Sequence, residues 1–159
     1  MLFVAIALCA GCTSSAGHAP PGIAPDRVSW CGAPDVTFED DGISPSATIK
    51  DWKHAQSLLG FTPLLPPSLP VGTCLVAAGG VVRNSTFGGR FLITYELPDH
   101  GALSLAESPK LGDIPTPQCS TGAGSITTCQ QTQNGLDVTI SSTQTATQLQ
   151  SLLTSLHPD

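Results

Sequence analysis

The distribution of cysteine is the feature of this sequence that most constrains what it can fold into. Cys9 lies in a short apolar segment at the N-terminus and Cys12 follows shortly after it, and the other four cysteines are spread over the rest of the chain. These four are Cys31, Cys74, Cys119 and Cys129. In an exported chain, an even set of four indicates two disulfides, with three possible pairings. The fold must then bring distant parts of the chain within bonding distance at two points.

Spacing favours one of the three pairings. Cys119 and Cys129 flank a short segment rich in Ser, Gly and Thr that can turn back on itself, so we expect these two to pair. That leaves Cys31 with Cys74, a bridge across a long loop that stabilises a fold by about 3–4 kcal/mol when it is unstrained. This second bridge would tie the segment around Trp30 onto the domain.

A metal site is not expected from these cysteines or from the histidines. The chain contains no CxxC pair, and His18, His54, His100 and His157 show none of the spacings that metal ligands have. No cofactor is expected either, because the Gly-Gly pairs lack the lysine and the spacing of a phosphate-binding loop.

The chain begins with residues 1–10, an apolar segment without a charge. It is shorter than the roughly 20 apolar residues of a transmembrane helix and matches the hydrophobic region of a signal peptide. The next residues, Ala10-Gly11-Cys12, resemble the lipobox of bacterial lipoproteins, in which small residues precede a cysteine that takes a diacylglyceryl group. The match departs at Cys9, where the lipobox has an aliphatic residue. The basic region that begins such signals is also missing, so we expect translation to start upstream of Met1.

This resemblance implies a signal peptide over residues 1–11 and lipidation at Cys12. Residues 13–25 are rich in Pro, Gly, Ala and Ser, so we assign residues 12–27 to the lipidated cysteine and a flexible tether. Residues 28–159 then form a single extracytoplasmic domain, held at the membrane by the lipid on the cell surface or in the periplasm. The alternative is a secreted protein that is cut near Ala10, with Cys12 as an ordinary thiol.

Periodicity predicts the elements of this domain. Residues 48–59 and 145–156 carry apolar side chains at helical spacing, and Gly60 would end the first helix. Alternating segments predict strands, and Asn134-Gly135 predicts a tight hairpin. We therefore expect an α+β domain. It has an antiparallel sheet of about five strands, with a helix before the sheet and a C-terminal helix packed on one face.

Charge excludes one large class of partner. Charged residues make up 11% of the chain, the formal net charge is −6, and the six Lys and Arg residues are scattered. No basic stripe exists to neutralise phosphates, so nucleic-acid binding is not expected. An acidic surface gains nothing from anionic lipid, so membrane attachment would depend on the N-terminal lipid.

About two-thirds of the chain resembles a bacterial family that is catalogued as a domain of unknown function. The resemblance runs through a series of short motifs: His54-Ala55-Gln56, Gly60-Phe61, Pro63-Leu64-Leu65-Pro66, Leu69-Pro70-Val71-Gly72, Tyr95 and Ser155-Leu156. The family occurs in extracytoplasmic lipoproteins and in the outer segments of some membrane-anchored sigma-factor regulators. It has no established catalytic residues, so the resemblance implies an extracytoplasmic domain and assigns no active site.

Few residues in the sequence indicate chemistry. Glu39, Asp40 and Asp41 form an acidic cluster that could bind Ca²⁺, but the EF-hand pattern is absent and a solvated turn is the expected structure. Asp99 and His100 could act as an acid–base pair with Glu107, which makes an envelope hydrolase the alternative function. Trp30 and Trp52 are expected to be core residues. We expect no catalytic residues.

The leading hypothesis is therefore a lipid-anchored, non-enzymatic domain that binds or senses an unknown ligand, such as an envelope protein or peptide. A purely structural envelope lipoprotein is a further alternative. The candidate binding surface comprises the apolar crossover at residues 61–70 and the sheet edge at residues 83–89. Its residues are Phe61, Leu65, Phe87 and Arg90.

The lipidation hypothesis predicts the intact mass of the protein in its native membrane fraction. We expect a species that begins at Cys12, carries acyl chains and gains four hydrogens on reduction, because each disulfide takes up two. An unlipidated chain with free thiols would contradict both the anchor and the disulfides. It would also return the four domain cysteines to the list of reactive residues.

Overall fold

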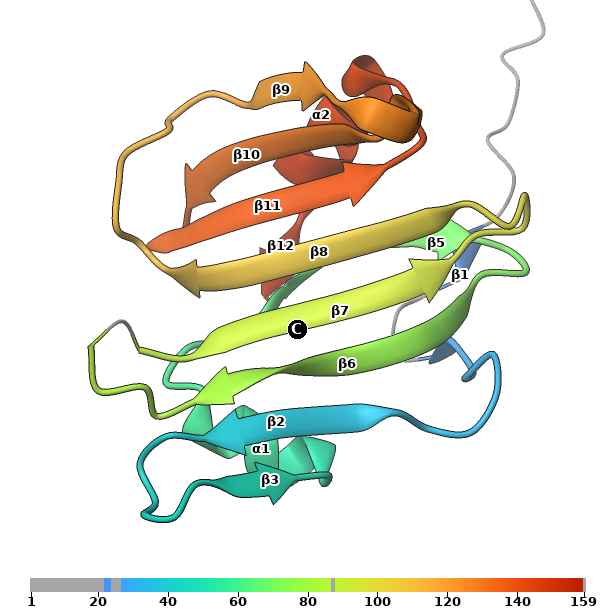
Figure 1. The fold of residues 1–159 in the computed structure, drawn as a ribbon. Helices are drawn as coiled ribbons and strands as arrows, with labels where there is room; N and C mark the ends of the chain where they lie inside the picture. Colours follow the sequence, from blue (N-terminus) through green and yellow to red (C-terminus); the bar gives the residue numbers. More distant parts are fainter. Residues whose placement is uncertain (1–21, 24–26, 87, 159) are drawn as a thin grey trace, which may run out of the picture.

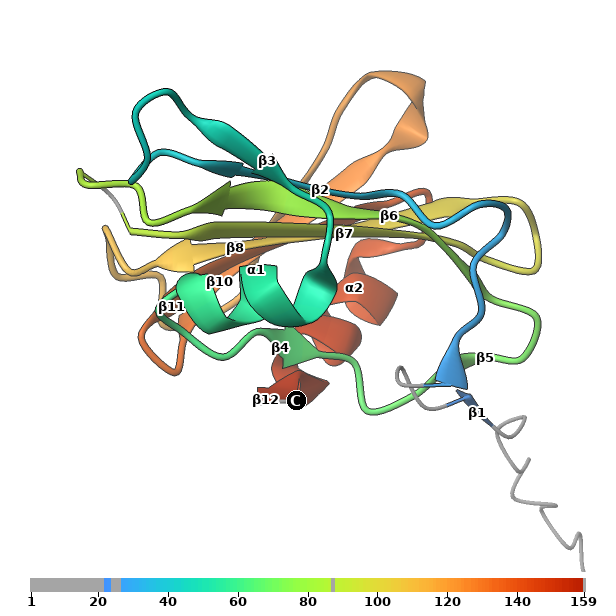
Figure 2. The ribbon, with the colours of Figure 1, turned by 90° about the horizontal axis from the view of Figure 1, so that it is seen from below.

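Eight strands form one sheet, and both helices lie against the same face of it (Figures 1 and 2). The computed structural model describes residues 22–23, 27–86 and 88–158. The order of strands is β3-β2-β6-β7-β8-β11-β10-β9. Their bounds are β2 Val36–Asp40, β3 Ala47–Ile49, β6 Cys74–Val82, β7 Arg90–Glu96, β8 Ala102–Pro109, β9 Gln118–Thr121, β10 Thr127–Gln133 and β11 Leu136–Ser142.

The mixed α and β composition matches the sequence-based expectation, but the prediction of about five strands is wrong. The sheet has eight strands, and the two edge strands β3 and β9 have only three and four residues. Such short segments show no alternation that a pattern can detect. The expectation of a helix before the sheet is also wrong, because β2 and β3 precede the first helix.

The first helix, α1 (Trp52–Leu58), is shorter than the predicted residues 48–59. Its N-cap is Asp51, whose carboxylate accepts a hydrogen bond from the His54 N–H at 2.8 Å. The preceding residues belong to β3 instead, because Ile49 pairs with Phe38 of β2. Gly60 follows the helix with φ of 78°, the left-handed conformation that ends a helix at low cost.

The second helix, α2 (Ala146–Ser155), agrees with the prediction to within one residue at each end. Thr145 and Gln148 form a capping box at its N-terminus, so the side chain of each satisfies the backbone N–H of the other. Leu149 and Leu153 are fully buried. The helix packs on β9, β10 and β11, at the end of the sheet opposite α1.

A proline-rich crossover covers the middle of the same face, between the two helices (Figure 2). It contains two short strands, β4 (Leu64–Leu65) and β5 (Leu69–Pro70). β4 pairs with the C-terminal β12 (His157–Pro158), and β5 pairs with β1 (Gly22–Ile23). Residues 22–23, which the sequence pattern assigned to the tether, thus pair with the domain.

Strict alternation along β7, β8 and β11 separates an apolar face from a polar one. Phe91, Ile93 and Tyr95 of β7 point to the helix side and are buried, and Leu105 and Ile140 lie on the same side. The intervening residues point to the other face, which no helix of the described chain covers. One solvated face is usual for antiparallel sheets.

Both disulfides have the pairing that the spacing predicts. Cys119 and Cys129 are directly opposite each other on β9 and β10. Cys31 is joined to Cys74 at the start of β6, and this bridge closes a sequence separation of 43 residues. Two disulfides indicate an oxidising, extracytoplasmic environment. None of the described helices is long and apolar enough to cross a membrane.

The two disulfides should differ in what they contribute to stability. Replacing Cys31 and Cys74 together by serine is expected to lower the free energy of unfolding by about 4 kcal/mol, because that bridge closes the longer loop. The same change at Cys119 and Cys129 should cost about 3 kcal/mol. Urea denaturation of both variants and of the unmodified protein measures the difference. A larger loss from the shorter loop would contradict this account.

Candidate functional site

An apolar pocket of about 310 Å³ lies on the helix side of the sheet, between α1, the crossover and the segment that precedes β2. Its floor is formed by β6 and β7. Ala78 pairs with Ile93 across these strands, and Phe91 and Tyr95 flank Ile93 on the same face. Alternation along β7 therefore directs three consecutive inward side chains into one surface.

One wall of the pocket is Trp30, which lies in an irregular segment beside β6. The backbone holds it there: the Cys31 N–H donates to the Leu75 carbonyl at 2.9 Å, and the Leu75 N–H donates to the Ser29 carbonyl at 2.8 Å. The Cys31–Cys74 disulfide fixes the same segment covalently. Trp30 thus belongs to the fold and remains half-buried at the pocket.

The opposite walls come from α1 and from β4. Trp52, the first residue of α1, contacts the rings of Phe91 and Phe38, with centroid distances of 5.4 and 5.9 Å. Leu65 of β4 closes the side that faces the crossover. The Trp52 side chain is also half-buried, although it packs against the core.

The lining of this pocket is apolar and uncharged. Its described residues carry no charge, no imidazole and no thiol, and their polar groups are the two indole N–H groups and the Tyr95 hydroxyl. An apolar cavity with a few polar groups is the usual form of a small-molecule site. From the sequence, Trp30 and Trp52 were expected to be core residues. The feature that marks the site is that both tryptophans of the chain line the same cavity.

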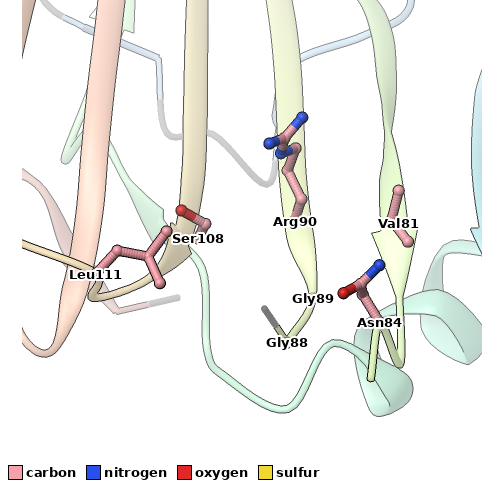
Figure 3. A pocket seen from close by; sticks show the side chains of 7 residues that line it. All are labelled: Val81, Asn84, Gly88, Gly89, Arg90, Ser108 and Leu111. Carbon is pink, nitrogen blue, oxygen red and sulfur yellow. The ribbon is translucent and has the colours of Figure 1, made fainter. Parts of the chain in front are cut away.

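A second pocket, of about 280 Å³, lies at the end of the β6–β7 hairpin (Figure 3). Arg90, Asn84 and Ser108 line it together with Val81, Leu111 and two glycines. Arg90 extends from the polar face of β7, opposite to Phe91, and forms no ion pair with another residue of the described chain. This pocket has a charged side chain in its lining, which the apolar pocket lacks.

The three described residues of the predicted binding surface do not form one surface. Leu65 lines the apolar pocket, and Phe61 is half-buried against the core. Arg90 lies on the opposite face of the sheet, and Phe87 lies outside the described residues. The sheet separates the two halves of this prediction.

The acidic cluster is dispersed by the alternation of β2. Asp40 is buried on the helix side, where Arg83 pairs with it and the Gly42 N–H donates to it at 2.9 Å. The hydrogen bond from Arg83 holds the pKa of Asp40 below its ordinary value. Asp41 accepts from the Asn84 amide at 2.8 Å, and Glu39 is exposed on the other face. The three carboxylates do not converge on a cation site.

One further group of possible metal ligands exists in the described chain, and it also fails to form a site. The sulfurs of Cys31 and Cys74 lie close to a carboxylate oxygen of Glu96. The two sulfurs are bonded to each other, so neither is available as a thiolate ligand.

The predicted acid–base group of Asp99, His100 and Glu107 is not assembled. Asp99 and His100 lie in the turn between β7 and β8, where His100 Nδ1 is 2.7 Å from an oxygen of Glu96. Glu107 lies near the other end of β8, opposite Phe91, and only 1% of it is exposed. The exposed pair and the buried carboxyl therefore cannot act on one substrate.

A depression beside β3 and α1 is another place where acidic and basic groups meet. Asp40, Asp51, His54 and Arg83 line it. Both carboxylates are engaged by the fold, Asp40 with Arg83 and Asp51 as the N-cap of α1. A general base needs a carboxylate that is free to take a proton from substrate, so this arrangement favours a structural role.

Glu107 connects the crossover to the sheet. Both of its carboxylate oxygens accept from the Leu64 N–H of β4, at 2.9 and 3.1 Å. Burial raises the pKa of Glu107 from its ordinary value of 4.5 to about 7, because desolvation disfavours the charged form. Its partner precedes Leu65, so this hydrogen bond also positions one wall of the apolar pocket.

Comparison with protein-family models, with curated proteins and with solved structures finds no match to this chain. The resemblance to a bacterial domain of unknown function therefore stays a prediction.

The raised pKa of Glu107 predicts how the stability of the protein depends on pH. Between about pH 4.5 and about pH 7 the folded protein keeps a proton that the unfolded chain has lost, so the free energy of unfolding falls as pH rises. The total loss is about 3 kcal/mol. Glu107→Gln, which stays neutral, should make this dependence shallower by that amount. Urea denaturation at about pH 5 and about pH 8 measures it.

The two carboxyls with lowered pKa values do not obscure this range. Hydrogen bonds from the Leu111 N–H and from Arg83 lower the pKa values of Asp137 and Asp40, so these groups titrate at more acidic pH. An unchanged pH dependence in Glu107→Gln would show that the carboxyl titrates normally.

Proposed function

We propose that this chain is an extracytoplasmic binding domain, anchored through a lipid on Cys12, whose ligand occupies the apolar pocket between Trp30 and Trp52. One observation carries the proposal: a cavity of about 310 Å³ is bounded by uncharged side chains, with two half-buried tryptophans at its walls. A cavity of this size and composition lies at the lower end of the range of small-molecule sites.

Energetics support a ligand at this place. A half-buried tryptophan leaves apolar area in contact with water, at a cost of roughly 25 cal/mol per Å² relative to full burial. Two tryptophans at one cavity, next to Leu65 and Val36, concentrate this cost in one part of the surface. A bound apolar group would remove that area from water.

Rigid construction of the pocket also supports binding. Its floor is two paired strands, and its Trp30 wall is tied down by a disulfide and two backbone hydrogen bonds. A preformed site loses little conformational entropy when a ligand enters, which favours affinity. A hydrolase remains the alternative function, but the acidic and basic side chains discussed above are separated or already engaged.

The binding role predicts a pocket-dependent stabilisation by material from the envelope. The protein with both disulfides formed is incubated with aqueous and organic extracts of the envelope fraction, and its thermal unfolding and native mass are measured. A ligand at a hundredfold excess over its Kd should raise the free energy of unfolding by about 2.7 kcal/mol. Ala78→Leu, which fills the floor of the pocket, should abolish this gain.

A matched control is Ala106→Leu, the same substitution on the opposite face of the sheet. Ala106 lies between Leu92 and Thr139 on β8 and does not line the apolar pocket. Stabilisation that survives Ala78→Leu would place the ligand elsewhere. Chemical turnover of any extracted compound would contradict a purely binding role.

A further inference from the structure

The volume and the lining of the apolar pocket indicate which chemical class of ligand it can hold. We infer that the pocket takes an uncharged, aromatic ring system of about two rings; this inference depends on the proposed function. It names a class of ligand for the same site, and it excludes ligands whose anionic group must enter the pocket.

The size follows from comparison with a cavity of known occupancy. A dry, apolar cavity of about 150 Å³ holds one benzene molecule. The pocket here has about 310 Å³, roughly twice that volume. Two rings therefore fit, and a larger ligand would extend through the open side past the half-buried tryptophans.

The preference for rings follows from the walls. Phe91 and Trp52 lie with their ring centroids 5.4 Å apart at an interplanar angle of 42°, and Trp30 and Tyr95 add two more aromatic surfaces to the same cavity. Tilted and offset rings at 4.5–7 Å are the geometry in which aromatic groups attract each other beyond simple burial of area. An aromatic ligand can form such contacts with several walls at once.

The exclusion of charge follows from what the pocket lacks. No described residue of the lining is ionised, so an anionic group inside it would lose its hydration without gaining a partner. Such burial is strongly unfavourable. The indole N–H groups can orient a neutral polar substituent at most.

The chain carries its own reporter for this test. Its two tryptophans are Trp30 and Trp52, and both line the pocket. A bound fluorophore with an aromatic skeleton should therefore accept energy from them, and tryptophan emission should fall as the dye's emission rises. The single substitutions Trp30→Phe and Trp52→Phe separate the two contributions.

The experiment uses a matched pair of dyes, neutral phenylnaphthylamine and charged anilinonaphthalene sulfonate, which share a skeleton of three aromatic rings and differ in a sulfonate on the naphthalene. The two naphthalene rings would fill the pocket, and the phenyl ring would extend through its open side. We expect one neutral dye to bind per chain, at least about ten-fold more tightly than the sulfonate. Ala78→Leu should weaken the neutral dye by about ten-fold or more, because three added carbon atoms occupy the floor. Ala106→Leu should change its affinity by less than about two-fold.

Three results would overturn the inference: equal or tighter binding of the sulfonate, equal loss in the two leucine variants, or no binding of the neutral dye. If Ala78→Leu fails to fold, Trp30→Ala replaces it as the test variant, because the Cys31–Cys74 disulfide still holds the segment that carries residue 30. An unchanged affinity of Trp30→Ala for the neutral dye would contradict the site. If the dyes fail but envelope material still binds in a pocket-dependent way, the ligand class is wrong and the binding role stands. If neither the dyes nor the envelope material binds in a pocket-dependent way, both the ligand class and the binding role are wrong.

Discussion

The apolar face of the eight-stranded sheet must be buried, and this requirement determines where the other elements pack. Phe91, Leu105 and Ile140, from three adjacent strands, present a continuous apolar surface that cannot remain in water. Three separate segments cover it: α1 at one end, α2 at the other and the proline-rich crossover between them. The polar face needs no cover, so the molecule has two layers, with its core between them.

The apolar pocket is the place where this cover is incomplete. Its walls belong to segments that would otherwise move independently, and each is held by a specific interaction. The Cys31–Cys74 disulfide holds the wall that carries Trp30, and the hydrogen bond from the Leu64 N–H to Glu107 holds the wall that carries Leu65. The pocket between the layers therefore has a defined shape without a ligand, which is the condition for preorganised recognition.

The same alternation that builds the pocket separates the acidic and basic side chains from one another. Neighbouring residues of a strand point to opposite faces, so Glu39 and Asp40 lie on different sides of β2. Glu107 is turned into the core, where it binds the crossover, while His100 lies exposed in a turn at the other end of the strand. The acidic and basic groups of the described chain are therefore dispersed or already paired within the fold.

Local signals in the sequence determined the parts of this protein that depend on neighbouring residues. The capping box at Thr145, the Asn134-Gly135 hairpin and the short Cys119–Cys129 loop were all predictable, because each is decided within about ten residues. The tertiary structure decided the number of strands and the pocket. β3 is too short to show a period. Trp30 and Trp52 line one pocket only because a disulfide and a helix bring distant segments over the same strands. Such proximity results from tertiary packing, and the periodicity of residues along the chain does not indicate it.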